Sequence, residues 1–253
     1  MNQLLNKNIL ITGASDGLGR ELALAFAREG ASALSLVARR GALLKTVSEE
    51  ITSINPEIKV IPIEGDVSHP KDVERIVATT LHAFGGHINV LVNNASTIGP
   101  SPMPYLLDYP LEDFMAVLNT NLTGPFLMIR NALPSMIECG GSIINVTSDA
   151  GTVGYPGWGA YGISKFGLEG MSQTWAAELE ESNVRVNLVD PGDMNTAMHR
   201  AAEPDEDPDQ WASPADVTDV FVFLASDKSK GITGKRLQAQ EDWQEMLQVT
   251  QIL

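Results

Sequence analysis

The chain has 253 residues, of which 43 % are hydrophobic, and its formal net charge is −15. This length allows one large α/β domain or two small ones, and the apolar content is ordinary for a globular core. An acidic surface repels nucleic acid and anionic membranes, and no apolar run reaches the roughly 18 residues that suggest a membrane span. We therefore expect neither a nucleic-acid partner nor a membrane partner.

Short apolar segments alternate with longer amphipathic ones along the chain. The apolar segments predict strands at 7–12, 33–38, 59–63, 88–92, 142–147, 184–189 and 236–239. The amphipathic segments predict helices at 17–29, 41–53, 71–84, 111–138, 160–181 and 215–225. Strands separated by helices of this length predict a parallel sheet with helices on both faces. Because no linker or repeat divides the chain, we expect an α/β fold with a doubly wound parallel sheet in a single domain over residues 1–253.

The cysteine and histidine content bears on the cellular compartment and on whether the protein binds a metal. Cys139 is the only cysteine, so an intrachain disulfide is excluded, which fits a reducing cytoplasm. The four histidines are scattered and lack the spacing of metal ligands. We therefore expect a cytoplasmic protein without a metal site.

A tyrosine and a lysine, Tyr161 and Lys165, lie one helical turn apart in the stretch YGISK and follow Ser148. Side chains four residues apart on a helix project from the same face. A neighbouring ammonium favours the phenolate, so we expect Lys165 to lower the pKa of the phenol from its ordinary value of about 10. With a serine hydroxyl beside it, such a pair can exchange a proton with a substrate oxygen. The pair is common by chance, and its weight comes from a glycine-rich turn elsewhere in the chain.

That turn follows the first predicted strand, which runs into TGASDGLG with Gly13, Gly17 and Gly19. Glycines here permit a tight turn and the close approach of a pyrophosphate, whose charge the following helix N-terminus favours. The alternative is an ordinary glycine turn between a strand and a helix. No Gly-Lys-Ser/Thr sequence follows, so the motif is not a Walker loop.

The residues after the second predicted strand bear on the choice of dinucleotide. An acid about 20 residues beyond the last glycine usually holds the ribose 2′-hydroxyl of NAD. This chain has Ala38 there, followed by Arg39 and Arg40. A guanidinium can bind a 2′-phosphate, which favours NADP, with NAD still possible. Asp16 opposes this preference because its carboxylate would repel a 2′-phosphate, and the alternative is a surface arginine pair that opens a helix.

Together with further motifs in order, these features resemble the short-chain dehydrogenase/reductase family from about residue 6 to residue 234. The further motifs are Asp66-Val67, NNAS from Asn93 to Ser96, NLTG from Asn121, NVTS ending at Ser148, and Pro191-Gly192 with Thr196. The resemblance implies a Rossmann-type fold and hydride transfer between a nicotinamide and a carbonyl or alcohol substrate. The usual Asp-Gly-Gly ending is absent, so residues 235–253 form an atypical tail.

The resemblance also implies residue roles. Tyr161 is the expected general acid/base, Lys165 would lower its pKa and bind the nicotinamide ribose, and Ser148 would hold the substrate oxygen. Asn121 would keep a water in a proton relay. The expected cofactor contacts, besides Tyr161 and Lys165, are Gly13, Ser15, Gly17, Leu18, Gly19, Arg39, Arg40, Asp66, Val67, Asn93, Ala95, Pro191, Gly192 and Thr196. Alternatively, Asn93 and Asn121 satisfy backbone groups, and Thr196 is only a helix N-cap.

Substrate specificity in the family resides after Pro191-Gly192, which makes residues 193–212 the expected substrate loop. Candidate apolar walls, with core packing as the alternative, are Tyr155, Trp158, Met194, Met198 and Trp211. Apart from Arg200, this loop contains no basic residue, and no arginine or lysine is obviously placed to take a substrate carboxylate or phosphate. We therefore expect a neutral or moderately apolar small-molecule carbonyl or alcohol. Relatives form dimers or tetramers, and we expect a homodimer or homotetramer.

Two other functions stay open beside a carbonyl reductase or alcohol dehydrogenase. The first is a 3-oxoacyl-carrier-protein reductase, for which the charge of −15 is unfavourable because the carrier is itself acidic. The second is a non-catalytic dinucleotide sensor or scaffold. Such proteins typically lose part of the catalytic set, whereas Asn121, Ser148, Tyr161 and Lys165 are all present here.

Overall fold

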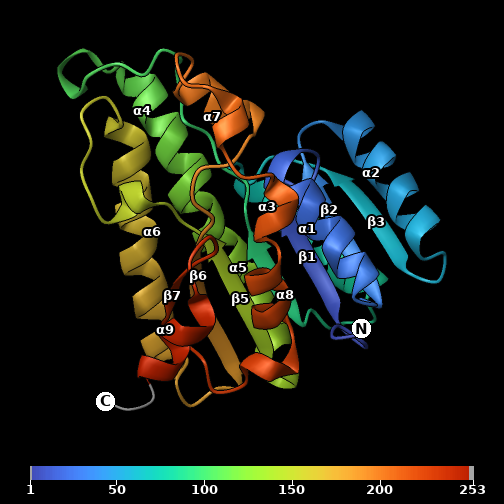
Figure 1. The fold of residues 1–253 in the computed structure, drawn as a ribbon. Coiled ribbons are helices and arrows are strands. Elements are labelled where there is room, and N and C mark those ends of the chain that lie inside the picture. Colours follow the sequence, from blue (N-terminus) through green and yellow to red (C-terminus); the bar gives the residue numbers. More distant parts are fainter. Residues whose placement is uncertain (1, 251–253) are drawn as a thin grey trace.

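The computed structural model describes residues 2–250, which form a seven-stranded parallel sheet with helices on both faces (Figure 1). The order across the sheet is β3-β2-β1-β4-β5-β6-β7. The strands are β1 (Asn8–Thr12), β2 (Ala33–Ala38), β3 (Lys59–Glu64), β4 (Val90–Asn93), β5 (Gly141–Val146), β6 (Val184–Asp190) and β7 (Arg236–Gln238). The predicted fold class, a doubly wound α/β sheet, is confirmed.

Two sets of helices cover the two faces of the sheet. One face carries α1 (Gly17–Arg28), α2 (Gly41–Ile54) and α8 (Asp219–Ala225), and the other carries α3 (Pro70–Ala83), α5 (Gly124–Cys139) and α6 (Gly159–Glu178). The remaining α-helices described are α4 (Leu111–Leu118), α7 (Ala197–Ala202) and α9 (Trp243–Thr250). Single turns are η1 (Leu106–Asp108), the π-helical η2 (Asn119–Thr123), η3 (Asp149–Gly151), η4 (Pro208–Gln210), η5 (Pro214–Val217) and η6 (Asp227–Ser229). Within residues 2–250, every helix is too short or too polar to traverse a bilayer.

The central strands are apolar along their whole length because both of their faces are buried. In β1, Ile9 and Ile11 pack in the core beneath α1 and α8, whereas Leu10 packs in the core beneath α3 and α5. In β4, Val90 and Leu91 divide between the two cores in the same way. Each fully buried aliphatic side chain contributes roughly 1.5–3 kcal/mol to burial free energy, so the two cores hold the sheet rigidly beneath the loops.

The predicted strands and helices are confirmed in order, with ends shifted by a few residues, but three details differ. The helix predicted over 111–138 is helical throughout, but a π-helical turn, Asn119–Thr123, separates its two α-helical parts, α4 and α5. The helix predicted over 215–225 begins as the turn η5, and α8 starts only at Asp219. The tail contains helix α9 beyond its predicted strand, held where Trp243 packs on Phe223 with ring centroids 4.9 Å apart.

The strand order reverses next to β1, which pairs with β2 on one side and with β4 on the other. In open α/β sheets, ligands bind in the crevice at the carboxyl ends of the strands beside such a reversal. The loops after β1, β4, β5 and β6 meet at this edge, and α7 lies above it at the top of Figure 1. The topology therefore places a binding crevice where the sequence motifs lie.

Candidate active site

A cavity of about 760 Å³ follows the carboxyl ends of the strands, within the range of roughly 300–1,000 Å³ that is usual for small-molecule sites. The predicted site residues that line it are Gly13, Ser15, Gly17, Leu18, Arg39, Arg40, Asp66, Val67, Ala95, Ser148, Tyr161, Lys165, Pro191, Gly192 and Thr196. Three predicted residues, Gly19, Asn93 and Asn121, are not part of its wall.

The glycine turn presents bare backbone to one end of the cavity. Gly13 and Gly17 have φ of 68° and 51°, in the left-handed region that favours glycine. A Cβ on Gly13 would lie 2.9 Å from Ala95 Cα, and Gly17 opens α1, whose N-terminus faces the cavity. Gly19 lies behind the turn, where a Cβ would collide with the Gly13 carbonyl. The cradle therefore suits a diphosphate, with Gly19 setting the distance between helix and strand.

Asn94 ties this turn to the end of β4, and it was not among the predicted site residues. Its amide donates to the carbonyls of Thr12 and Gly13 at 3.0 and 3.2 Å. The Thr12 hydroxyl accepts from the backbone N–H groups of Asn94 and Ala95 at 3.0 and 3.1 Å. The sequence offered one signal for this role, the alternation of side chains along a strand. Because neighbouring side chains at a strand end point to opposite faces, Asn94 faces away from its buried neighbour.

Asn93 is the buried neighbour. It is 3 % exposed, and its amide donates to Asn145 Oδ1 at 2.8 Å, while Asn145 donates to Ser172 at 2.8 Å. The structure thus places Asn93 in a polar network inside the sheet. Its hydrogen-bond partner is a side chain rather than a backbone group, and Asn93 is not part of the cavity wall.

Asp16, whose carboxylate opposes the predicted NADP preference, is already paired. One oxygen accepts from the N–H of Gly17 at 2.8 Å, and the other lies 3.2 Å from a guanidinium nitrogen of Arg40, which also donates to Ser15 Oγ at 3.2 Å. Both charged side chains are about half exposed, with 57 % and 52 % of their surface accessible, so the pair is weak and can rearrange. Among residues 2–250, Arg39 has no ion-pair partner and lines the cavity beside this pair.

Asp66 and Val67 line the same end of the cavity. The Asp66 carboxylate accepts from the N–H and the hydroxyl of Ser68 at 2.9 and 2.7 Å, and its own N–H donates to Asp72 at 2.9 Å. These bonds fix the carboxylate at the cavity wall. Arg39, which the sequence assigns with Asp66 and Val67 to the cofactor, lines the same cavity.

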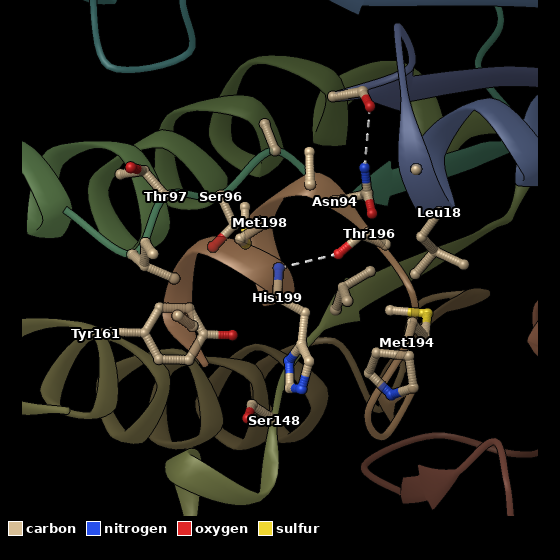
Figure 2. A pocket seen from close by; sticks show the side chains of 18 of the residues that line it. Leu18, Asn94, Ser96, Thr97, Ser148, Tyr161, Met194, Thr196, Met198 and His199 are labelled. Carbon is tan, nitrogen blue, oxygen red and sulfur yellow. Dashed lines mark hydrogen bonds between the residues drawn. The ribbon is translucent and has the colours of Figure 1, made fainter. Parts of the chain in front are cut away.

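Tyr161, Lys165 and Ser148 line the same cavity. Figure 2 shows Tyr161 from α6 and Ser148 from the end of β5 facing a common space. The Lys165 ammonium lies 5.3 Å from the centroid of the Tyr161 ring. Lys165 is 3 % exposed and donates to the Val146 carbonyl at 2.9 Å. Burial lowers the pKa of Lys165 to about 8, and the carboxylates of Asp190 and Glu169 oppose that fall.

The structure corrects the prediction that Lys165 lowers the pKa of Tyr161. Burial raises the pKa of Tyr161 above its ordinary value, against a lowering by the Ser148 hydroxyl and with a further rise from Asp190 and Asp149. The Lys165 ammonium is bonded to the Val146 carbonyl and lies over the ring, so it does not offset the burial. In this state the phenol is protonated at neutral pH and is ready to donate.

The Ser148 hydroxyl begins the turn η3. It accepts from the N–H of Ala150 at 3.2 Å and donates to Asp149 Oδ1 at 2.9 Å. Asp149 is exposed and also lines the cavity. Ser148 must turn its hydroxyl proton away from Asp149 before it can polarise a substrate oxygen.

Asn121 lies behind the reacting groups, inside the π-helical turn η2, and is 1 % exposed. Its amide accepts from the N–H of Thr97 and donates to the carbonyl of the same residue, both at 2.8 Å, and donates to Ser164 Oγ at 3.0 Å. These bonds account for the π-helical turn inside the predicted helix, because that turn brings the Asn121 side chain inward to bind a neighbouring loop. They match the alternative in which Asn121 satisfies backbone groups.

The turn after β6 forms another wall. Gly192 has φ of 69° and donates its N–H to Asp190 Oδ1 at 3.0 Å. Gln240, from the tail, donates to the carbonyls of Pro191 and Asp193 at 2.9 and 2.8 Å. The tail therefore holds this wall in place. This role could not be predicted, because the tail lacks the family's usual ending.

Residues 193–212 close over the cavity. Met194 and Ala212 pair at the base of the loop, and Ser101 Oγ donates to the Ala201 carbonyl at 2.7 Å. Thr196 lines the cavity and also caps α7 by accepting from the N–H of His199 at 3.1 Å, so both interpretations of Thr196 are compatible with its position (Figure 2). The predicted walls that line the cavity are Tyr155, Trp158, Met194 and Met198.

Trp211 does not line the cavity. It packs edge-on against His199 with ring centroids 4.3 Å apart, and His199 projects into the space near Tyr161 and Ser148 (Figure 2). The scattered histidines gave no sign of a site in the sequence, because His199 reaches the cavity only when the loop folds. No group of three or more potential metal-binding side chains occurs within the described residues.

Comparison with known proteins agrees with this geometry. The family model of short chain dehydrogenases matches residues 7–207. A 3-oxoacyl-[acyl-carrier-protein] reductase of Thermotoga maritima is 36 % identical over 248 residues, which cover 92 % of this chain and 96 % of that protein. The uncharacterized oxidoreductase YciK of Escherichia coli is 34 % identical over 244 residues, covering 94 % and 93 %.

Solved structures are equally similar. A Pseudomonas syringae protein classed as a short chain dehydrogenase matches with a TM-score of 0.89 and 37 % identity, covering 95 % of this chain and 97 % of that one. A Shigella flexneri protein of the same class, complexed with NADP, matches with a TM-score of 0.88 and 30 % identity, covering 95 % and 100 %. By its sequence, its fold and the residues that line its cavity, this chain belongs to the short-chain dehydrogenase/reductase family of oxidoreductases.

Proposed function

We propose that the protein is an NADP(H)-preferring oxidoreductase that moves hydride between the nicotinamide and a carbonyl or alcohol substrate. The observation that supports this best is that one cavity is lined both by Tyr161, Lys165 and Ser148 and by Gly13 and Gly17 of the glycine turn. Carbonyl reduction needs a dinucleotide cradle, a proton donor and a polarising hydroxyl. NADP-bound relatives support the same cofactor class.

Each reacting group has a distinct task in this proposal. A bound nicotinamide supplies hydride, which no side chain can provide. Tyr161 holds a proton at its hydroxyl and delivers it to the substrate oxygen, and Ser148 donates to the same oxygen. Lys165 uses one of its three N–H groups on Val146, leaving donors for a cofactor ribose and a positive charge beside the phenol as its proton leaves. A relay role for Asn121 stays a prediction.

The cofactor preference depends on Arg39. We expect Arg39→Ala to weaken NADPH binding about tenfold or more and to leave NADH binding nearly unchanged, because a guanidinium–phosphate contact is charge-assisted. Dissociation constants from fluorescence titration measure both. Arg40→Ala should also weaken NADPH binding, since it releases the Asp16 carboxylate.

Arg130→Ala is the matched control, because Arg130 is an exposed arginine of α5 outside the cavity wall. Unchanged NADPH affinity in Arg39→Ala, or an equal loss for NADPH and NADH, contradicts the assignment of Arg39 to a 2′-phosphate.

The loop 193–212 and the turn after Ser148 bring acidic residues to the cavity. Asp149, Asp193, Glu203 and Glu206 line it from these segments, whereas the basic lining residues are Lys165 and the two arginines that follow β2. An anionic substrate would be repelled here. We therefore propose a neutral or cationic carbonyl or alcohol, selected by the loop 193–212.

A 3-oxoacyl-carrier-protein reductase is the second candidate, supported by similarity to that enzyme of Thermotoga maritima. It ranks lower because an acidic carrier would meet an acidic cavity mouth on a chain of net charge −15. A family member with this function would need a basic surface near the cavity.

A substrate panel with NADPH and NADH, followed by absorbance, tests both candidates. The panel contains neutral ketones and aldehydes, amino ketones, oxo acids and an acetoacetyl-carrier protein. Turnover of the neutral or cationic members supports the proposal, and turnover of the carrier substrate alone supports the second candidate. Tight NADPH binding without turnover of any member would contradict both and favour a sensor.

We propose a homo-oligomer formed through the neighbouring helices α4 and α6 (Figure 1). Leu111 and Met115 of α4 and Ile163 and Phe166 of α6 are exposed apolar side chains, and such clusters mark interfaces. Phe166→Glu is expected to convert the oligomer to a monomer in light scattering, because it places a charge in the apolar contact. Leu43→Glu, on exposed α2, is the control that should leave the assembly intact, and a monomeric wild type contradicts the proposal.

A single domain over residues 1–253 and a cytoplasmic location stay predictions from the sequence.

A further inference from the structure

The last strand of the sheet brings an arginine behind the reacting groups. Arg236 of β7 has 23 % of its side chain exposed. Its guanidinium donates to Glu169 Oε1 of α6 at 3.1 Å and to Asp190 Oδ2 of β6 at 2.8 Å. It also donates to the carbonyl of Ser148, at the end of β5, at 3.3 Å. One side chain thus joins three elements that carry site residues.

Both carboxylates that Arg236 binds are buried, with 9 % of Glu169 and 6 % of Asp190 exposed. Each is also bonded to the cavity wall: Glu169 accepts from the hydroxyl of Thr147 at 2.7 Å, and Asp190 accepts from the N–H of Gly192 at 3.0 Å. Buried carboxylates are costly unless they are paired and hydrogen-bonded. Arg236 is the cation that pairs with both.

The same two carboxylates act on Lys165, where each favours the protonated ammonium. The other ionisable groups around it are Tyr161 on its own helix and Asp149 on η3, while β5 presents the Val146 carbonyl. The positive charge of Arg236 therefore reduces the negative electrostatic potential that Glu169 and Asp190 create at Tyr161 and Lys165.

We propose that Arg236 is a positioning residue of the active site, which holds the Ser148 backbone and compensates the negative charge behind Tyr161 and Lys165. A lysine cannot take its place fully, because a point charge lacks the fork that reaches three acceptors at once. The kinetic part of this inference rests on the proposed function, whereas its electrostatic part does not.

The first experiment measures Lys165 in protein without cofactor. The protein carries lysine labelled with ¹³C at the ε-carbon, and a Lys165→Met variant identifies the Lys165 signal in an NMR pH titration. Arg236→Met removes a positive charge, so the apparent pKa of Lys165 should rise by roughly half a unit or more. Glu169→Gln removes a negative charge with little change of shape, so the pKa should fall.

Shifts of opposite sign support the proposal, and shifts of the same sign or no shift overturn it. If Arg236→Met does not fold, Glu169→Gln still decides, because an unchanged titration of Lys165 in that variant overturns the proposal. Arg185→Met is the matched control. It removes another partly buried arginine, which donates to the Leu224 carbonyl and to Ser229 Oγ outside the cavity wall, and it should leave the Lys165 titration unchanged.

The second experiment uses turnover. Arg236→Met should lower kcat about tenfold or more and move the alkaline rise of alcohol oxidation to higher pH, since added negative potential holds the proton on Tyr161. The double variant Arg236→Met/Glu169→Gln should regain the wild-type pH profile, and Arg236→Lys should keep that profile with reduced kcat. An Arg236→Met enzyme with wild-type kcat and pH profile overturns the proposal. A wild type without turnover on any substrate sinks the proposed function, while the NMR titration still decides the role of Arg236.

Discussion

Tyr161→Phe is expected to lower turnover by about 10³-fold while NADPH binds as tightly as to the wild type. A positioned general acid contributes roughly 10²–10⁴-fold, and this change removes only the hydroxyl. The phenyl ring keeps its edge-on packing against Trp158, with centroids 5.5 Å apart, so the cavity wall stays in place. Steady-state kinetics with the best substrate of the panel and a fluorescence titration with NADPH measure the two quantities.

Tyr109→Phe is the control for this variant. Tyr109 also has a buried hydroxyl, but it lies outside the cavity wall, so its loss should leave turnover near the wild-type value. Turnover of Tyr161→Phe within tenfold of the wild type would show that another group moves the proton, and the proposed mechanism would then be abandoned.

Gly19→Ala is expected to destabilise the protein by about 1–3 kcal/mol, the usual cost of overpacking, and to weaken NADPH binding at least tenfold. The added Cβ would lie 2.6 Å from Asn94 Nδ2 and 2.8 Å from the Gly13 carbonyl carbon. Neither neighbour can move freely, because the Asn94 amide donates to the carbonyls of Thr12 and Gly13 at the start of the glycine turn. Urea unfolding measures the free-energy change, and fluorescence titration measures cofactor binding.

Gly154→Ala serves as the comparison, since Gly154 lies in an exposed loop where a Cβ would meet nothing within 4 Å. Its free energy of unfolding should stay close to that of the wild type. If the two alanine variants have the same free energy of unfolding and the same NADPH affinity, the packing of α1 against the glycine turn does not determine cofactor binding.

Much of the fold could be predicted from the sequence because its signals are local. The buried strands are apolar runs, and several turns into helices carry glycine or a capping residue, as at Asp16-Gly17 at the start of α1 and Thr196 before α7. The spacing of Tyr161 and Lys165 defines one helical face, and Ser148 follows a strand whose carboxyl end had to lie at the crevice. These residues therefore reach the cavity as predicted positions, although their chemical roles remain proposals.

Features that depend on contacts between distant segments were not predictable. Arg236 and Ser148 are 88 positions apart in the chain, and the tail contains no family motif from which their contact could be predicted. The inward turn at Asn121 depends on Thr97, in a loop 24 positions away. The direction of the Tyr161 pKa was missed for the same reason, because it depends on how deeply the fold buries the phenol rather than on the spacing to Lys165.

The place of β7 has a consequence for how the protein is made. This strand pairs only with β6, and it leaves the ribosome after every other strand of the sheet. Since nascent chains fold from the N-terminal side, the glycine turn, Ser148 and Tyr161 can assemble before the guanidinium that neutralises Glu169 and Asp190 has arrived. A chain that terminated ahead of Arg236 would carry the glycine turn, Ser148, Tyr161 and Lys165, yet it would hold Glu169 and Asp190 in its interior without their arginine partner, which would lower its stability.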